Sequence, residues 1–144
     1  TPNEIKRYTR KISGPLLDRI DIHVHVPRVK YEDMTSVEKA ESSAAIRERV
    51  LATREIQMER LQEWGIFCNA QMSHAILKKT CHLEPEAQNL LAQAFQVMNL
   101  SARSYDRIIK VARTIADLDG AATIEAKHVG EAIQLRDDVG LSVE

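Results

Sequence analysis

An alternating pattern of apolar and polar residues stands out near the start of the chain, over residues 20–26. β-Branched residues occupy every second position and face one side, while Asp21, His23 and His25 face the other, which is the period of a β-strand. Pro27 ends the pattern. A single strand is not stable alone, so we expect its partners in sequence that precedes this chain or in a second copy of it. The segment therefore suggests a piece of a longer protein.

The next part of the chain predicts helix. Residues 36–64 contain no Gly or Pro and carry an imperfect apolar stripe among many charged residues. This pattern predicts one long helix, or two nearly continuous ones, that leans on the rest of the protein along one side. Gly65 is expected to end it. A short helix is expected from about Ser73.

The last part of the chain predicts a compact helical array. Pro85 stands near the start of one helix, and Ser101 is a suitable N-cap for a second that ends at Gly120. Thr123 is the expected cap of a third. The buried face of the second helix is predicted to consist of Tyr105, Ile108, Ile109, Ala112, Ile115 and Ala116. Residues 138–144 have no period and are expected to fray.

Composition narrows the function classes. The chain has 144 residues, 44% hydrophobic and 28% charged, with a net charge of −1. Such a balance is that of an ordinary globular domain and supplies no global basic field for nucleic acid. Two cysteines are too few for a disulfide framework and fit a reducing cytoplasm. No apolar run approaches a membrane span, so we expect a cytoplasmic protein without membrane contact.

Arginines are the most informative candidates for chemistry. Arg103, Arg107 and Lys110 share one face of the helix that starts after Ser101. Arg103 lies in the first turn, where the helix dipole favours anions, so it is a candidate phosphate ligand; the alternative is a solvated face. Arg19 stands between Asp18 and Asp21. It is either a member of a surface ion pair or a guanidinium that the aspartates aim at a ligand.

Metal and nucleophile sites find little support. His23 and His25 share a strand face without a third ligand nearby in sequence. A second candidate zinc set has a spacing that matches no usual closed site; its members are Cys68, His74, Cys81 and His82. We predict no metal site. No glycine-rich phosphate loop, nucleophile elbow or zinc-protease motif is present in the sequence.

Three stretches resemble one family: "RYTRKISGPLLDRIDIHVHVP", "ESSAAIRERV" and "LSARSYDRIIKVARTIADLDG". They are similar to the C-terminal part of the magnesium-chelatase-like AAA+ ATPases of bacteria, the ComM/YifB group. The resemblance implies that Arg19 of "LLDRID" is an arginine finger that acts on a neighbouring subunit. It also implies that Arg103 is the sensor-2 arginine of a lid helix, with Arg107 a weaker second choice. Residues 36–64 and those that follow resemble the insertion before sensor 2.

The resemblance implies a mainly α fold: the truncated end of an AAA+ core with one strand, a long helical connector and a helical lid bundle. The expected divisions are residues 1–30, 31–83, 84–137 and a tail at 138–144. By itself this fragment is expected neither to bind a cofactor nor to hydrolyse ATP.

For the full-length protein the resemblance implies a hexameric ATPase that uses ATP and Mg²⁺ to translocate DNA, including branch migration during competence. Two alternatives stay open. One is a chelatase-type motor that remodels a protein partner, and the other is a structural helical adaptor without a nucleotide role.

Overall fold

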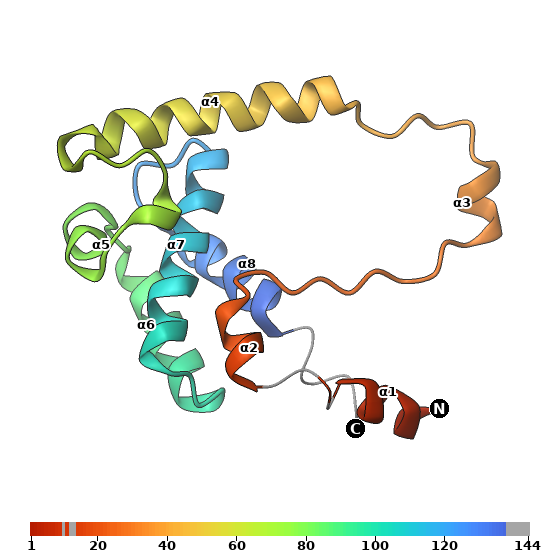
Figure 1. The fold of residues 1–144 in the computed structure, drawn as a ribbon. Helices are drawn as coiled ribbons and strands as arrows, with labels where there is room; N and C mark the ends of the chain where they lie inside the picture. The colour runs from red at the N-terminus through yellow and green to blue at the C-terminus, as the bar shows by residue number, and fades with distance from the viewer. Residues whose placement is uncertain (10, 12–13, 138–144) are drawn as a thin grey trace.

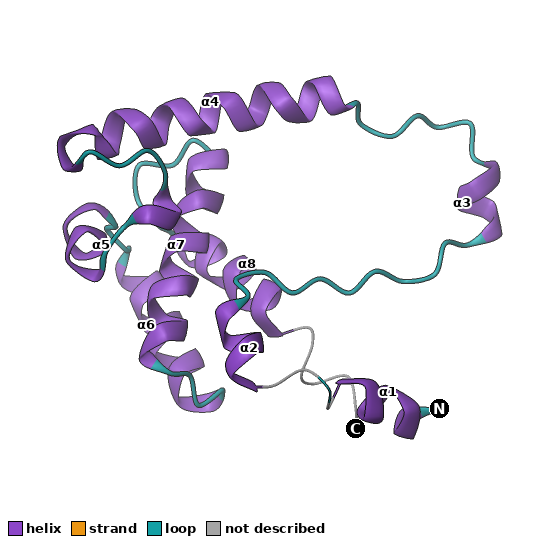
Figure 2. Cartoon of the chain, in the orientation of Figure 1, coloured by secondary structure: helices purple, strands orange, loops and turns teal. Residues whose placement is uncertain are grey.

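The computed structural model describes residues 1–9, 11 and 14–137, and this part of the chain is built from helices joined by loops, without a β-strand (Figure 2). The predicted tail at 138–144 lies outside the described residues. The α-helices are α1 Pro2–Thr9, α2 Gly14–Arg19, α3 Tyr31–Thr35, α4 Ser43–Leu61, α5 His74–Thr80, α6 Pro85–Val97, α7 Ala102–Leu118 and α8 Ala126–Asp137. Two 3₁₀ turns lie between α4 and α5, η1 Gln62–Trp64 and η2 Asn69–Gln71.

Helix α7 is the centre of the fold (Figure 1). It packs against α8, α5 and the C-terminal half of α4, and α6 covers α8. The predicted apolar face is confirmed, because Ile108, Ile109, Ala112 and Ala116 are buried in the core and Tyr105 and Ile115 pack against them. The 3.6-residue period alone was sufficient to identify this face.

Most helix ends follow the sequence signals. The Ser101 hydroxyl accepts a hydrogen bond from the Ser104 amide at 3.2 Å and caps α7. Ser73 caps α5 in the same way, accepting from Ile76 at 3.3 Å. Gly65 adopts a φ of 67° after the turn that follows α4, and Gly120 a φ of 69° after α7, so both take the left-handed conformation that glycine tolerates best.

The expected cap of α8 is wrong. Thr123 donates to the Glu84 carboxylate at 2.8 Å instead, and α8 begins only at Ala126. The reason is a short parallel bridge between Leu83 and Ile124 that keeps the chain extended beyond Thr123. Nδ1 of His128 accepts the Glu125 amide at 3.0 Å, which is the place that Glu or Gln takes in a capping box.

The long helix is shorter than predicted. Residues 36–42 are not helical, and α4 starts after Ser42, whose hydroxyl accepts the Ala45 amide at 3.2 Å. A serine that bonds the backbone in this way favours a helix start over a helix interior. Only the C-terminal half of α4 is held by the bundle, with Thr53, Gln57 and Leu61 buried.

The predicted strand over Ile20–Val26 is wrong for the described structure. After α2 the chain leaves the bundle, passes through α3 and returns to α4 as an extended loop (Figure 1). Val24 is 63% exposed and Val26 81%. No other described segment runs beside these residues as a strand, and a strand forms only when a partner pairs with its backbone.

None of the described helices is both long and apolar enough to cross a bilayer.

Candidate functional site

Arg19 ends helix α2, is exposed, and its guanidinium makes no hydrogen bond or ion pair with any described residue. The two flanking aspartates do not hold it. Asp21 pairs with Arg107 at 2.5 Å, and Asp18 lies 3.8 Å from Arg136. Both interpretations of the sequence, a local ion pair and a guanidinium aimed by the aspartates, are therefore wrong about Asp18 and Asp21, which pair with other residues. The aspartates anchor the segment, and Arg19 is left free.

The backbone around Arg19 is held by the same two arginines. Arg107 Nη1 donates to the Arg19 carbonyl at 2.7 Å. Arg136 Nη2 donates to the Asp18 carbonyl at 3.0 Å, and its Nη1 to the Ile20 carbonyl at 3.3 Å. Carbonyls at a helix C-terminus lack partners within the helix and carry partial negative charge. Arg107 of α7 and Arg136 of α8 thus cap the C-terminal end of α2.

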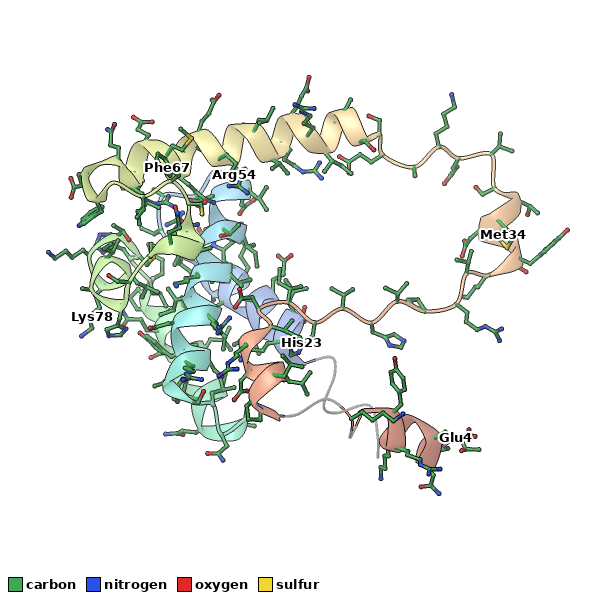
Figure 3. All side chains as sticks on the ribbon, in the orientation of Figure 1. Glu4, His23, Met34, Arg54, Phe67 and Lys78 are labelled. Atoms are coloured by element: carbon green, nitrogen blue, oxygen red, sulfur yellow. The ribbon has the colours of Figure 1, made fainter. Side chains whose placement is uncertain are left out.

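His23 adds a second attachment just beyond the helix. Its side chain is buried, with Nδ1 3.1 Å from the Arg136 carbonyl oxygen and Nε2 3.2 Å from that of Leu17. Its amide donates to the Leu135 carbonyl at 2.5 Å. His23 is labelled in Figure 3, where the chain leaves the bundle. Residues 17–23 are consequently docked on α8 before the loop begins.

Arg103 projects from the first turn of α7 and is exposed, again without a hydrogen bond or ion pair to the described residues. The predicted shared face is present, because Arg103, Arg107 and Lys110 all line one surface hollow of about 610 Å³. Only Arg103 is free on this face: Lys110 donates to the Ala70 carbonyl at 3.3 Å, and Arg107 is engaged with the Arg19 segment. In this structure Arg107 therefore holds the segment that carries Arg19, through the Arg19 carbonyl and the Asp21 carboxylate.

A buried polar network that the sequence pattern did not predict joins α4, η2 and α7. Asp117 accepts hydrogen bonds from Arg60 at 2.7 and 2.8 Å, from Arg113 at 3.0 Å and from Asn69 at 3.0 Å. Arg113 also donates to the carbonyls of Ala121 and Ala122, which follow α7. The signal that could have found part of it is the i, i+4 pair Arg113–Asp117 on the apolar face of α7.

This network controls the titration of its one carboxylate. Burial by itself would raise the pKa of Asp117, but the hydrogen bonds from Arg60 and Asn69 and the charges of Arg113 and Arg60 outweigh it. The pKa of Asp117 therefore lies below its ordinary value of 3.8. Asp117 is ionised at neutral pH and neutralises part of the charge of the two arginines.

Two of the residues considered for metal binding are engaged elsewhere. His74 pairs with Asp106 at 2.8 Å, and Cys81 lies in the core, where burial raises the pKa of its thiol. A different group, Asp119, Glu125 and His128, gathers within 4.8 Å among the described residues. The Lys127 ammonium lies 2.9 Å from the Asp119 carboxylate and 3.3 Å from that of Glu125. The positive charge beside these carboxylates is therefore that of a lysine side chain.

Comparison with known proteins agrees with the sequence motifs. Residues 40–136 match the family described as magnesium chelatase, subunit ChlI C-terminal, and residues 1–34 match magnesium chelatase, subunit ChlI. The first match alone spans more than half of the chain, and it covers α4 to α7, including the Arg103 helix, and α8 except for its last residue. The second contains α2 and Arg19.

Several curated relatives align with nearly the whole chain. It is 39% identical to competence protein ComM of Haemophilus influenzae, 36% to YifB of Escherichia coli and 34% to YifB of Salmonella typhimurium. Each alignment covers 94% of this chain and 26% of the relative, so the chain spans about a quarter of the length of these proteins. The chain belongs to the magnesium-chelatase ChlI family and corresponds to the C-terminal part of its ComM/YifB-like members.

Proposed function

We propose that this chain is the C-terminal part of an AAA+ ATPase that couples ATP hydrolysis to translocation on DNA, including branch migration. In this proposal the full-length protein assembles as a hexamer and uses ATP with Mg²⁺. Residues 1–30 are the end of the ATPase core, 31–83 the connector and 84–137 the lid. Arg19 acts as arginine finger on a neighbouring subunit, and Arg103 acts as sensor 2.

The observation that carries the proposal is the contrast between free and engaged arginines on one side of the fold. The guanidinium groups of Arg107 and Arg136 donate hydrogen bonds to the backbone carbonyls of residues 18–20. Those of Arg19 and Arg103 have no partner among the described residues. A guanidinium matches the geometry of phosphate oxygens and keeps its charge at any physiological pH. Both free arginines therefore fit a nucleotide supplied from outside this chain.

The chemical role follows from phosphoryl transfer. Negative charge spreads over the phosphate oxygens in the transition state, and a positioned guanidinium lowers the barrier by stabilising that charge. An exposed arginine at the end of an anchored helix can do this for a site on another subunit. Arg103, at the positive end of the α7 dipole, is suited to a bound phosphate in the same or an adjacent subunit.

DNA as the partner is supported by the name of the Haemophilus influenzae relative, a competence protein. A second candidate function, a motor that remodels a protein partner, is favoured by the match to a magnesium-chelatase subunit. The two differ in one observable, since only the first predicts that DNA stimulates ATP hydrolysis.

The test is the steady-state ATPase rate of the full-length protein with and without branched DNA. We expect stimulation by DNA, and a loss of about tenfold or more, equal to about 1.4 kcal/mol of barrier, in Arg19→Ala and in Arg103→Ala. The matched control is Arg47→Ala, an exposed arginine on α4. If both variants retain the full rate, neither arginine acts on nucleotide and the structural adaptor is the better account.

A further inference from the structure

Arg107 and Arg136 connect the proposed finger to the helices of the lid. We infer that they are positioning residues that fix Arg19 to α7 and α8, so that Arg19 and Arg103 move as one unit. The inference rests on the proposed function and goes beyond it, because it assigns a role in the reaction to two residues that would not touch nucleotide.

The first argument is that α2 cannot place Arg19 by itself. It has six residues, Gly14–Arg19, and a helix of this length is not stable without tertiary contacts. The contacts that hold its C-terminal end are donors to three consecutive carbonyls, those of Asp18, Arg19 and Ile20. The planar fork of an arginine can serve two carbonyls at once, which a lysine cannot do with the same geometry.

The second argument is a continuous hydrogen-bonded connection between the two free arginines. Arg136, whose side chain is only 7% exposed, also donates to the Ser104 hydroxyl at 3.1 Å. Ser104 is buried, directly follows Arg103, and its hydroxyl lies 3.1 Å from that of the N-cap Ser101. The first turn of α7 is thus tied through one guanidinium to the backbone that carries Arg19.

A consequence follows for the reaction. A nucleotide bound by Arg103 biases the position of the lid helices, and any shift of α7 and α8 carries the end of α2 with it. Arg19 would then approach or leave a neighbour's nucleotide according to the state of its own lid. We call Arg107 and Arg136 the clamp residues. Replacing either clamp residue leaves the Arg19 side chain intact but allows its backbone to move from the position seen here. A misplacement of about 1 Å can cost about a hundredfold in rate.

A double-mutant cycle in the full-length protein tests this role. Arg107→Ala and Arg136→Ala are each prepared with Arg19 present and with Arg19→Ala, and Arg47→Ala is the control. We expect each clamp variant alone to lower kcat by about tenfold or more, with a smaller change in KM for ATP. In the Arg19→Ala background we expect the same substitutions to cause almost no further loss, because the group they position is gone.

Hydrogen exchange of the same proteins provides a readout that does not depend on catalysis. The amides of residues 19–23 should exchange faster in Arg107→Ala, whereas those in the centre of α7 should remain protected. Arg107 is 29% exposed, so its variant is expected to fold. Ser104→Ala removes a bond to Arg136 without removing a charge, and it is the second variant should Arg136→Ala not fold.

The outcomes separate the two proposals. An unchanged ATPase rate in Arg19→Ala would refute the arginine finger in the proposed function, and a positioning role for Arg107 and Arg136 would then have no finger to position. If Arg19→Ala loses activity but the clamp variants keep full kcat, the finger stands and the positioning role is refuted. Losses that multiply in the double variants, or unchanged exchange at residues 19–23, would equally refute the positioning role alone.

Discussion

Replacing Asp117 by asparagine removes a buried negative charge between α4 and α7 with little change in volume. The carboxylate, 1% exposed, accepts hydrogen bonds from Arg60, Arg113 and Asn69. In the variant one oxygen becomes an NH₂ group, which faces these donors and cannot accept from them. At least one guanidinium N–H therefore loses its acceptor, and both arginines lose their counter-charge.

Arg113 sets the size of the effect, because its side chain is 2% exposed and cannot regain water. Removing one partner of a buried ion pair costs about 3–5 kcal/mol. Arg60 is 21% exposed and can turn partly toward solvent, so we expect the lower end, about 3 kcal/mol. That is a large share of the stability of a domain, about 5–15 kcal/mol, yet it leaves the variant folded.

Urea unfolding followed by far-UV circular dichroism at neutral pH measures this loss. The expected fall in the midpoint is about 1–3 M, since the dependence on urea is about 1–3 kcal/mol per molar for small proteins. Asp33→Asn is the matched control, because Asp33 is an exposed aspartate of α3 without a described side-chain partner. A difference between the two variants below about 0.5 kcal/mol, the range of ordinary surface changes, would refute the reasoning.

Three further predictions concern the same bundle. Because the pKa of Asp117 is lowered on folding, its stabilisation is complete above its unfolded value near 3.8 and is lost as pH falls through the folded value; unfolding midpoints measured down to acidic pH should show this loss in the wild type and not in Asp117→Asn. His128→Ala should cost about 2 kcal/mol in thermal unfolding, because it removes the cap of α8 and its bond to Asp119, and His128→Gln should recover part of it. Gly65→Ala should cost about 1 kcal/mol because of its positive φ, whereas Gly130→Ala inside α8, where the added Cβ meets Leu90 at an ordinary 3.8 Å, should be neutral or stabilising in the same assay.

What the sequence could predict depends on local signals. The apolar face of α7, the caps at Ser73 and Ser101 and the glycine stops at Gly65 and Gly120 all lie within a few residues of the elements they define. The strand over residues 20–26 could not be judged from its own alternation, because strand formation depends on a partner elsewhere. The start of α4 differs from the prediction because the Ser42 cap stops the helix inside a stretch whose composition favours helix throughout.

The residues of the candidate site also divide into those with a local sequence signal and those whose role depends on distant partners. Arg19 and Arg103 were identified by motif, and both side chains are free in the structure. Arg136 was missed, because its partners at Asp18 and Ile20 lie more than a hundred positions away in the sequence. The contact of Arg60 with Asp117, 57 positions apart, is likewise a tertiary contact that no spacing rule predicts.

The most direct test of the proposed site is a structure of the full-length assembly with a non-hydrolysable ATP analogue and Mg²⁺. The account predicts that the Arg19 guanidinium lies within hydrogen-bond distance, about 3 Å, of the γ-phosphate bound by a neighbouring subunit, with Arg103 on a phosphate as well. An assembly with nucleotide bound in which both side chains point into solvent, away from every phosphate, would contradict it.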